Sequence, residues 1–246
     1  MKKIICSTLF DIFFIFWTIL CAIFGFPIGM SKKYAIYLGK FWANGVLIAL
    51  NFFCNIKYEC KDLEKMQGLS LILSKHQSAW ETIFFLAKIK NVTFVIKENL
   101  LKIPFYGWYL QNMGMIPVAR KISIMELKNM NKKIIQSIQS KKTVIIFPQG
   151  TRTNVVNNNI VKYKFGCLDI FNNISGKIGL VALNSGLFWK SGFTIKNNGT
   201  ILVKLIDIKN NKSEDFINLS KESLIQMKKE IQEKINSESE KIYFKK

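Results

Sequence analysis

The sequence predicts an α/β domain, a mixed sheet flanked by helices, with an amino-terminal apolar helical segment that serves as a membrane anchor. Beyond about residue 60, short apolar runs of strand length alternate with stretches of helical periodicity, which is the pattern of a layered α/β protein. Before residue 60, long apolar stretches carry almost no charge. We therefore expect two parts: a membrane-associated helical segment at residues 1–58 and an α/β domain at residues 59–246.

The first apolar stretch is long enough to cross a bilayer. Ile12–Gly29 contains no charged residue, which makes it a candidate span; it is too long for a signal peptide, and no small-residue cleavage site follows. A second stretch, Phe41–Ile56, is shorter and contains Asn and Gly, which favours an interfacial or re-entrant helix. Lysines flank the first stretch on both sides, so charge does not fix its orientation. A membrane span and shallow embedding both stay open.

The expected strands of the α/β domain are short runs of apolar and β-branched residues: Leu69–Ser74, Thr93–Lys97, Met115–Val118, Thr143–Phe147, Gly179–Leu183 and Ile201–Ile208. The expected helices show helical spacing of apolar residues: Ala79–Lys90, Pro104–Met113, Ile124–Ser140, Phe165–Asn173 and Lys221–Asn236. The asparagine-rich tract Asn154–Asn159 reads as a loop.

The net charge of +20 indicates a polyanionic partner: nucleic acid, an anionic membrane or a phosphorylated substrate. Of the 36 basic residues, only Arg120 and Arg152 are arginines, and both follow expected strands. A guanidinium group forms paired hydrogen bonds to phosphate that lysine cannot copy. Gly150 and Thr151 precede Arg152, and a glycine lets the backbone approach a ligand closely. A phosphate-binding pair is therefore expected, although a solvated surface arginine is the common alternative.

Cysteine and histidine usage argues against a metal centre. The chain has five cysteines and one histidine, an odd cysteine number without a CxxC pair. A disulfide framework or a zinc site is therefore not expected. A reducing compartment is expected. The single histidine excludes metal sites built from several histidines.

That histidine, His76, lies between an expected strand and an expected helix, and Glu81 follows five positions later. Residues at such strand ends line the ligand-binding crevice of open α/β sheets. The two side chains meet only if His76 precedes the helix and Glu81 lies in its first turn, because five residues on one helix separate them by roughly 140°. The segment from Ser78 to Glu81 is also a helix-start signature. In the alternative interpretation these two residues only cap a helix.

Four segments, KHQSAWE, GMIPVAR, FPQGTR and VALNSG, occur in this order over most of the chain. In content, order and approximate spacing they resemble the four conserved blocks of the glycerolipid acyltransferase family, and within it the bacterial 1-acyl-sn-glycerol-3-phosphate acyltransferases. The chain departs from the family's usual residues at three positions. Glu81 stands where the family usually has Asp, which keeps the carboxylate on a longer side chain, and Leu180 stands where the fourth block often has Pro. A third, Gln149 for Glu, removes a negative charge and puts in doubt any role that needs an anion there.

The resemblance implies an acyl transfer from a thioester, acyl-CoA or acyl carrier protein, to the sn-2 hydroxyl of lysophosphatidic acid, without a further cofactor. His76 would be the general base, because histidine has an ordinary pKa of about 6.5. Glu81 would orient the imidazole. The acceptor phosphate would bind Arg120, Gly150, Thr151 and Arg152.

The resemblance also implies attachment to anionic membrane lipids at the cytoplasmic face of a bacterial inner membrane. Lysines near an anionic leaflet contribute about 1 kcal/mol each, which would account for much of the positive charge.

Several other functions remain as alternatives. A related enzyme would acylate a different lysolipid, such as a lyso-ornithine lipid or a lysophospholipid. A nucleic-acid-binding protein would also be basic, but no recognition motif is present and no nucleic acid partner is expected. A hydrolase built on Cys167 and His76 would need a reactive thiol where the pattern indicates a buried helical one. A catalytically inactive lipid-binding protein would not need His76, Glu81 and Arg152 together.

Overall fold

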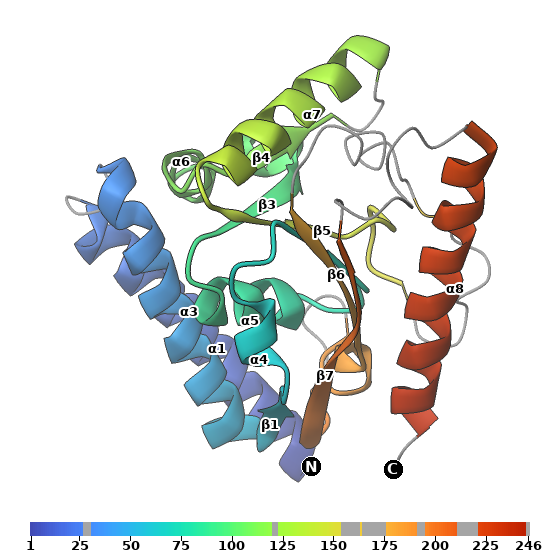
Figure 1. Ribbon diagram of the computed structural model, residues 1–246. Helices are drawn as coiled ribbons and strands as arrows, with labels where there is room; N and C mark the ends of the chain where they lie inside the picture. The colour runs from blue at the N-terminus through green and yellow to red at the C-terminus, as the bar shows by residue number, and fades with distance from the viewer. Residues whose placement is uncertain are drawn as a thin grey trace.

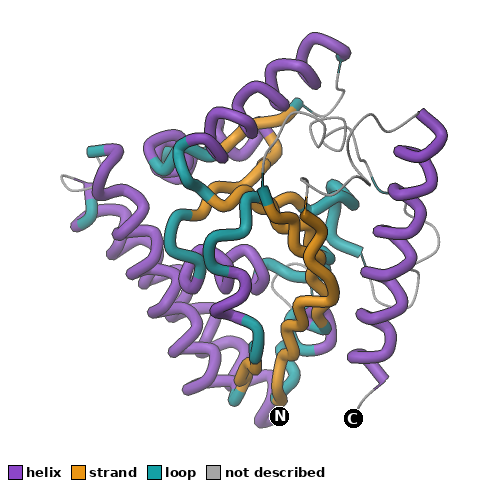
Figure 2. The backbone as a smooth tube through the Cα atoms, viewed as in Figure 1, coloured by secondary structure: helices purple, strands orange, loops and turns teal. Residues whose placement is uncertain are grey.

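The computed structural model describes residues 1–26, 31–119, 123–153, 163, 176–190, 195–210 and 221–244. These residues form one sheet between two layers of helices (Figures 1 and 2). The strands are β1 (Ile56–Glu59), β2 (Leu71–Ser74), β3 (Val92–Lys97), β4 (Ile116–Val118), β5 (Thr143–Ile146), β6 (Lys177–Leu183) and β7 (Gly199–Asn210).

The sheet is mixed, as the sequence predicts, with the strand order β1-β7-β6-β2-β5-β3-β4. β2 lies at its centre and pairs in parallel with both β5 and β6. β5, β3 and β4 continue the parallel part, whereas β7 runs antiparallel to β6. The carboxyl ends of β6, β2 and β5 therefore meet at one edge of the sheet.

Both faces of the sheet are buried, because side chains along a strand point alternately to opposite faces. Ile72 of β2 and Ile145 of β5 belong to the hydrophobic cluster on one face. Leu71, Leu73 and Val144 belong to the cluster on the other face. Near-continuous apolar runs such as LILS and TVII are the expected consequence.

One face is covered by α5 (Trp80–Lys88), on which α3 (Lys32–Cys54) and α1 (Lys2–Phe24) pack in turn (Figure 1). The other face is covered by α7 (Ile124–Gln139) and α8 (Lys221–Phe244). The remaining helices are short: α4 (Leu63–Met66), α6 (Tyr106–Asn112), η1 (Glu98–Lys102) and η4 (Ser185–Leu187). Because α5 starts directly after the loop that follows β2, it fixes the position of that loop.

The amino-terminal segment is a pair of helices, each long and apolar enough by length and composition to cross a membrane. Trp17 donates from Nε1 to the Trp42 carbonyl oxygen at 3.0 Å, and the Trp17 ring lies so close to Gly45 that a side chain there would collide with it. The expectation of a short second helix over residues 41–56 is wrong. α3 begins at Lys32, since the lysines and tyrosines of its first turns continue the helix at the surface.

Where the structure describes them, the other expected elements of the α/β domain agree with it within a few residues, except that the last helix runs on to Phe244. The short helices α4 and η1 were not expected. β1 pairs with β7 but was not expected from the sequence, because Ile56–Glu59 buries only its first residue. β1 also lies across the expected boundary, between residues 58 and 59, of the membrane-associated segment and the α/β domain. That boundary stays a prediction. The helix expected at Phe165–Asn173 and the loop at Asn154–Asn159 lie outside the described residues.

Candidate active site

The candidate site lies where β2, β5 and β6 end side by side. The loop after β2 carries His76, the loop after β5 carries Phe147 to Thr153, and η4 after β6 carries Ser185. Open α/β sheets bind their ligands beyond the carboxyl ends of the strands. The loops reach this edge together because β2 is parallel to both of its neighbours.

His76 and Glu81 are in contact: His76 Nδ1 lies 2.9 Å from Glu81 Oε1. His76 precedes α5 and Glu81 lies in its first turn, which is the placement that allows the two side chains to meet. The imidazole is 15% exposed and the carboxylate is fully buried. With Nδ1 donating to the carboxylate, Nε2 is left as an acceptor, and no described residue bonds to it. The pair has the form of a general base held by a carboxylate.

The Glu81 carboxylate also accepts hydrogen bonds from the protein backbone. The amides of Gln77 and Ser78 both donate to Oε1, the latter at 2.7 Å, and the Ser185 hydroxyl donates to Oε2 at 2.7 Å. Ser78 and Glu81 also cap the start of α5, as their spacing predicts: the Ser78 amide donates to Glu81, and Ser78 Oγ accepts from the Trp80 amide at 3.1 Å, although Ala79 is the N-cap residue. The carboxylate thus joins the loop, the imidazole and η4.

Two side chains from the FPQGTR segment hold His76 from the other side. The Phe147 ring stacks on the imidazole with a centroid separation of 4.3 Å and an interplanar angle of 19°. Gln149 Oε1 accepts from the His76 backbone amide at 2.8 Å, and its Nε2 donates to Thr153 Oγ1 at 2.6 Å. The Thr153 amide then donates to the His76 carbonyl oxygen at 3.0 Å. The departure at Gln149 therefore has a structural explanation: the buried amide serves once as acceptor and once as donor.

Of the residues expected to bind phosphate, Gly150, Thr151 and Arg152 are all exposed in the turn after β5. Gly150 has φ of +64°, a conformation that favours glycine. Arg152 directly precedes Thr153, which is bonded to the backbone of His76. Its positive charge also acts on Tyr106, where it opposes the rise in the pKa of the hydroxyl that burial causes. Arg120 lies outside the described residues, two positions beyond the end of β4.

Lys75, next to His76, points into the opposite face of the sheet and is fully buried. Its Nζ donates to Asn236 Oδ1 of α8 at 2.6 Å, and the Tyr163 hydroxyl donates to the same oxygen at 2.8 Å. Burial lowers the pKa of Lys75 to about 8, while the charge of Glu240 acts in the opposite direction. Lys75 thus ties the end of β2 to α8.

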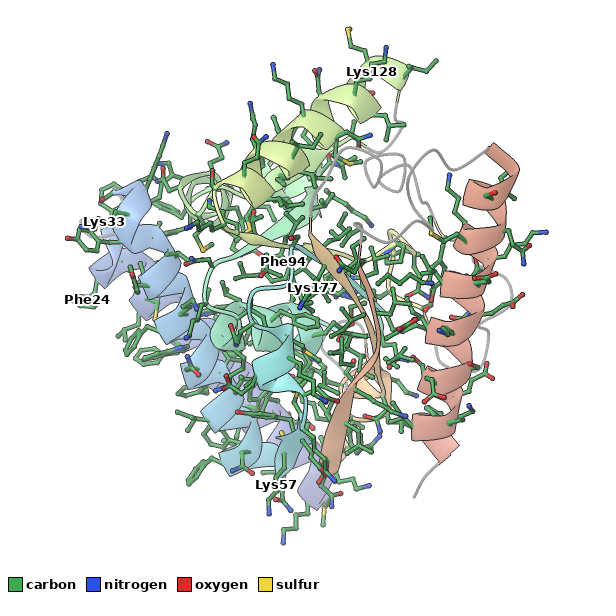
Figure 3. The ribbon with its side chains drawn as sticks, viewed as in Figure 1. Phe24, Lys33, Lys57, Phe94, Lys128 and Lys177 are labelled. Carbon is green, nitrogen blue, oxygen red and sulfur yellow. The ribbon has the colours of Figure 1, made fainter. Side chains whose placement is uncertain are left out.

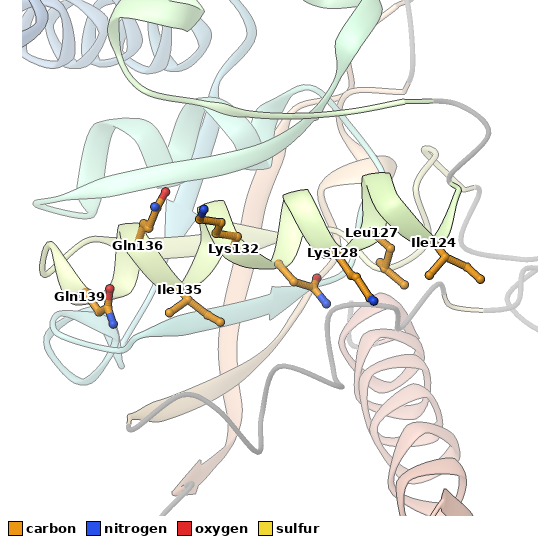
Figure 4. A pocket seen from close by; sticks show the side chains of 8 residues that line it. Ile124, Leu127, Lys128, Lys132, Ile135, Gln136 and Gln139 are labelled. Carbon is orange, nitrogen blue, oxygen red and sulfur yellow. The ribbon is translucent and has the colours of Figure 1, made fainter.

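A separate pocket follows α7 (Figure 4). Its lining combines apolar, amide and lysine side chains: Ile124, Leu127, Lys128, Asn131, Lys132, Ile135, Gln136 and Gln139. None of these is among the expected site residues. Within the described ranges, no group of three or more histidine, cysteine, aspartate or glutamate side chains is placed to hold a metal ion. Cys167 lies outside the described residues.

Sequence reasoning did not find the contributions of Phe147, Gln149, Thr153 and Ser185. A signal was present, since three of these lie in or next to the FPQGTR segment and Ser185 lies in VALNSG. Their roles depend on which atoms meet across strands β2, β5 and β6, and spacing along the chain does not contain that information.

Comparison with known proteins gives one family. The model of the family described as Acyltransferase matches residues 56–183. A 1-acyl-sn-glycerol-3-phosphate acyltransferase of Pseudomonas aeruginosa is 31% identical over 163 residues, which is 66% of this chain and 63% of that protein. The enzyme of the same name from Saccharomyces cerevisiae is 24% identical over 141 residues, 55% of this chain and 46% of that protein. Both alignments thus span less than two thirds of the relative.

A solved structure has the same fold along the entire chain. The crystal structure of the 1-acyl-sn-glycerophosphate acyltransferase PlsC from Thermotoga maritima superposes with a TM-score of 0.73. It covers 100% of this chain and 99% of that chain, at 19% sequence identity. The two amino-terminal helices are therefore part of the shared fold.

Proposed function

The chain belongs to the acyltransferase family, and from this premise we propose that it transfers a fatty acyl group from a thioester to the sn-2 hydroxyl of lysophosphatidic acid, giving phosphatidic acid. The observation that carries the proposal is the 2.9 Å contact between His76 Nδ1 and Glu81 Oε1. The other ring nitrogen, Nε2, has no hydrogen bond to any described residue. The names of the two acyltransferase relatives support lysophosphatidic acid as the acceptor.

In the proposed reaction His76 acts as a general base. Nε2 takes the proton of the sn-2 hydroxyl while the oxygen attacks the thioester carbonyl carbon. When the tetrahedral intermediate collapses, a C–O ester bond remains and the C–S bond breaks, and the imidazolium returns its proton to the leaving thiolate. Glu81 stabilises the imidazolium and keeps the proton of the neutral ring on Nδ1. No acyl-enzyme is needed, because the substrate hydroxyl is itself the nucleophile.

The acceptor phosphate is proposed to bind the turn after β5. Arg152 supplies a guanidinium group, and the exposed turn residues Gly150 and Thr151 let the phosphate approach the backbone closely. The hydrogen bonds among Thr153, Gln149 and the His76 backbone support this assignment, since they fix the turn relative to the imidazole. Binding the phosphate would hold the hydroxyl close to Nε2, and positioning contributes strongly to catalysis. Arg120 remains a proposed second phosphate ligand.

Membrane attachment is proposed to use the outer face of α1 and α3. Apart from Lys2, Lys3 and Thr8 in its first turns, the exposed residues of α1 are apolar: Ile4, Ile5, Leu9, Ile12, Ile15, Phe16, Ile19, Ile23 and Phe24. Those of α3 include Phe41, Ile48 and Phe52. At the far end of the pair, Phe24 and Lys33 point outward (Figure 3), and an apolar side chain next to a lysine suits the boundary between acyl chains and headgroups.

This helix pair is proposed to lie in one leaflet rather than to cross the bilayer. α1 contacts the α/β domain near both of its ends: Ser7 Oγ accepts from the Lys196 amide at 2.9 Å, and the Ala22 carbonyl oxygen accepts from the Tyr109 hydroxyl at 2.8 Å. The two contacts are separated by roughly 22 Å of helix. A polar domain packed along most of the helix favours embedding parallel to the surface, on the cytoplasmic face of a bacterial inner membrane.

The test is an assay of purified His76→Ala with both thioester carriers against a panel of lysolipids. Loss of about 100-fold or more in turnover is expected, with lysophosphatidic acid the best acceptor of the wild-type chain. Unchanged thermal stability and vesicle binding would show that the variant is folded. Turnover close to wild type in the variant would disprove the general base. If the wild-type chain preferred a lyso-ornithine lipid or another lysophospholipid, the general base would stand and the proposed acceptor would be wrong.

A further inference from the structure

We propose that Ser185 is a positioning residue that holds the Glu81 carboxylate in the orientation His76 requires. The inference rests on the proposed function of the His76–Glu81 pair and assigns a specific role to the fourth segment, VALNSG. Ser185 and Glu81 are separated by 104 residues in the sequence, and the Ser185 hydroxyl donates to Glu81 Oε2 at 2.7 Å.

The two carboxylate oxygens have different partners. Oε1 accepts from His76 Nδ1 and from the amides of Gln77 and Ser78. The partner of Oε2 among the described residues is Ser185. Rotation about the last side-chain bond of a glutamate is soft, so that hydrogen bonds at Oε1 alone do not fix the plane of the carboxylate. A donor at the opposite oxygen does.

Burial makes this donor difficult to replace. Ser185 and Glu81 both have no exposed surface. When a buried acceptor loses its donor, the free energy of its lost solvation is no longer compensated. This destabilisation is larger for a charged acceptor such as a carboxylate. Without the hydroxyl, Oε2 would gain by turning towards another donor, and Oε1 would then leave the imidazole.

The η4 turn that carries Ser185 is fixed from two directions. The Gly186 amide donates to Gln77 Oε1 at 3.1 Å, and Asn184 Oδ1 accepts from the Leu202 amide of β7 at 2.9 Å. Gln77 Nε2 is buried and has no hydrogen-bond partner in the described part of the chain. A buried unpaired donor is costly, so the contact of Gln77 with η4 is kept at the expense of stability. This supports a role in positioning over one in stability alone.

Three substitutions at this position separate the hydroxyl from the volume of the side chain. Ser185→Ala removes the donor, Ser185→Cys keeps the volume with a weak donor, and Ser185→Thr keeps the hydroxyl. A matched control is Ser239→Ala in α8, because Ser239 is also fully buried and its hydroxyl has no partner among the described residues.

We expect Ser185→Ala to lower kcat by about 10- to 100-fold, the effect of a displaced catalytic group. The KM values for acceptor and thioester should change by less than about threefold, since Ser185 is not proposed to touch substrate. Ser185→Cys should fall between Ala and wild type, and Ser185→Thr should recover most of kcat. Ser239→Ala should keep wild-type kinetics. Wild-type kcat in Ser185→Ala and Ser185→Cys would overturn the proposal, and if Ala does not fold, Cys and Thr decide.

A double-mutant cycle with Glu81→Gln distinguishes positioning from a purely structural role. If Ser185 acts through Glu81, the loss caused by Ser185→Ala should largely disappear in the Glu81→Gln background. Equal losses in both backgrounds would show that Ser185 acts independently of the carboxylate, and the inference would fail while the proposed function stands. A Glu81→Gln variant with wild-type kcat would reject the catalytic pair and the inference together.

Discussion

Asp11 of α1 forms an ion pair with Lys196, although 185 residues separate them in the sequence. The Lys196 side chain is fully buried, and its ammonium group lies 5.1 Å from the centroid of the Phe10 ring. Asp11 is the one charged residue of an otherwise apolar stretch. The pair shows that α1 is docked on the α/β domain and is not only an anchor joined to it by a linker.

We predict that Asp11→Ala destabilises the folded chain by about 1.5–3 kcal/mol, because the buried ammonium group of Lys196 loses a charged hydrogen-bond partner. Replacing Lys196 by Met in the same chain should recover most of this loss. The measurement is thermal unfolding in detergent, with Lys241→Ala as control, because the Lys241–Glu238 pair is exposed and should matter by less than about 1 kcal/mol. Equal effects of Asp11→Ala and Lys241→Ala would mean that burial of Lys196 does not matter.

The outer face of α1 provides a second prediction. Phe16 is 61% exposed there, and burying a phenylalanine side chain contributes about 1.5–3 kcal/mol. Phe16→Glu should therefore weaken binding to phosphatidylglycerol vesicles by about 10-fold or more, measured by co-sedimentation. Ile225→Glu is the control, since Ile225 is exposed on α8 at the opposite side of the sheet. A comparable loss in the control would locate the membrane contact elsewhere.

Substitution of Arg152 should change the KM for the acceptor and not the KM for the thioester. Because a lysine cannot form the paired hydrogen bonds of a guanidinium group, Arg152→Lys should raise the KM for lysophosphatidic acid by about 10-fold and leave the thioester KM unchanged. Arg152→Ala should raise it further. Lys57→Ala removes the same charge at the distant β1 edge and serves as control for general electrostatic attraction. An acceptor KM that stays constant in both Arg152 variants would exclude the phosphate contact.

Gln149 is predicted to matter through its two hydrogen bonds. Gln149→Ala leaves the His76 amide without its acceptor and removes the donor to Thr153 Oγ1, whose hydroxyl keeps only its bond to the His76 carbonyl oxygen. This should cost about 1–3 kcal/mol of stability and lower kcat. Gln149→Glu still offers an oxygen to each group if the Thr153 hydroxyl donates to it instead of accepting, and should retain kcat within about tenfold. Steady-state kinetics and thermal unfolding of both variants provide the check. An Ala variant as active as wild type would show that catalysis does not need the two hydrogen bonds of Gln149.

The lowered pKa of buried Lys75 predicts that the stability of the folded chain depends on pH. Its pKa is about 8 when folded and 10.5 as the ordinary value, so between these values the unfolded chain binds more protons than the folded chain. The contribution of Lys75 to stability should therefore increase as the pH rises from about 8 towards 10.5, by at most about 1.4 kcal/mol per pH unit. Comparison of unfolding midpoints at pH 7.5 and 9.5 with those of Lys75→Met isolates this contribution. The Met variant should gain less from the higher pH, and equal gains would disprove the assignment.

The sequence predicts the pairing of His76 with Glu81 because the pair is local. Strand β2, a short loop and the first turn of α5 determine the distance between them, and each of these elements has its own periodicity. The same reasoning cannot find Ser185 or Gln149 as neighbours of the pair, because they are brought there by strand pairing over 104 and 73 residues.

Local patterns alone thus determined the α/β class, the core strands, the apolar amino-terminal helices and the loops that carry the candidate site. Side-chain periodicity and turn residues encode these features within a few neighbouring positions. Only the tertiary structure decided that α1 is docked through Asp11, that Lys75 faces α8, and that donors from β5 and β6 fix the imidazole and its carboxylate. Those contacts depend on strand order and register, which follow from burying both faces of one sheet at once, and no single segment specifies them.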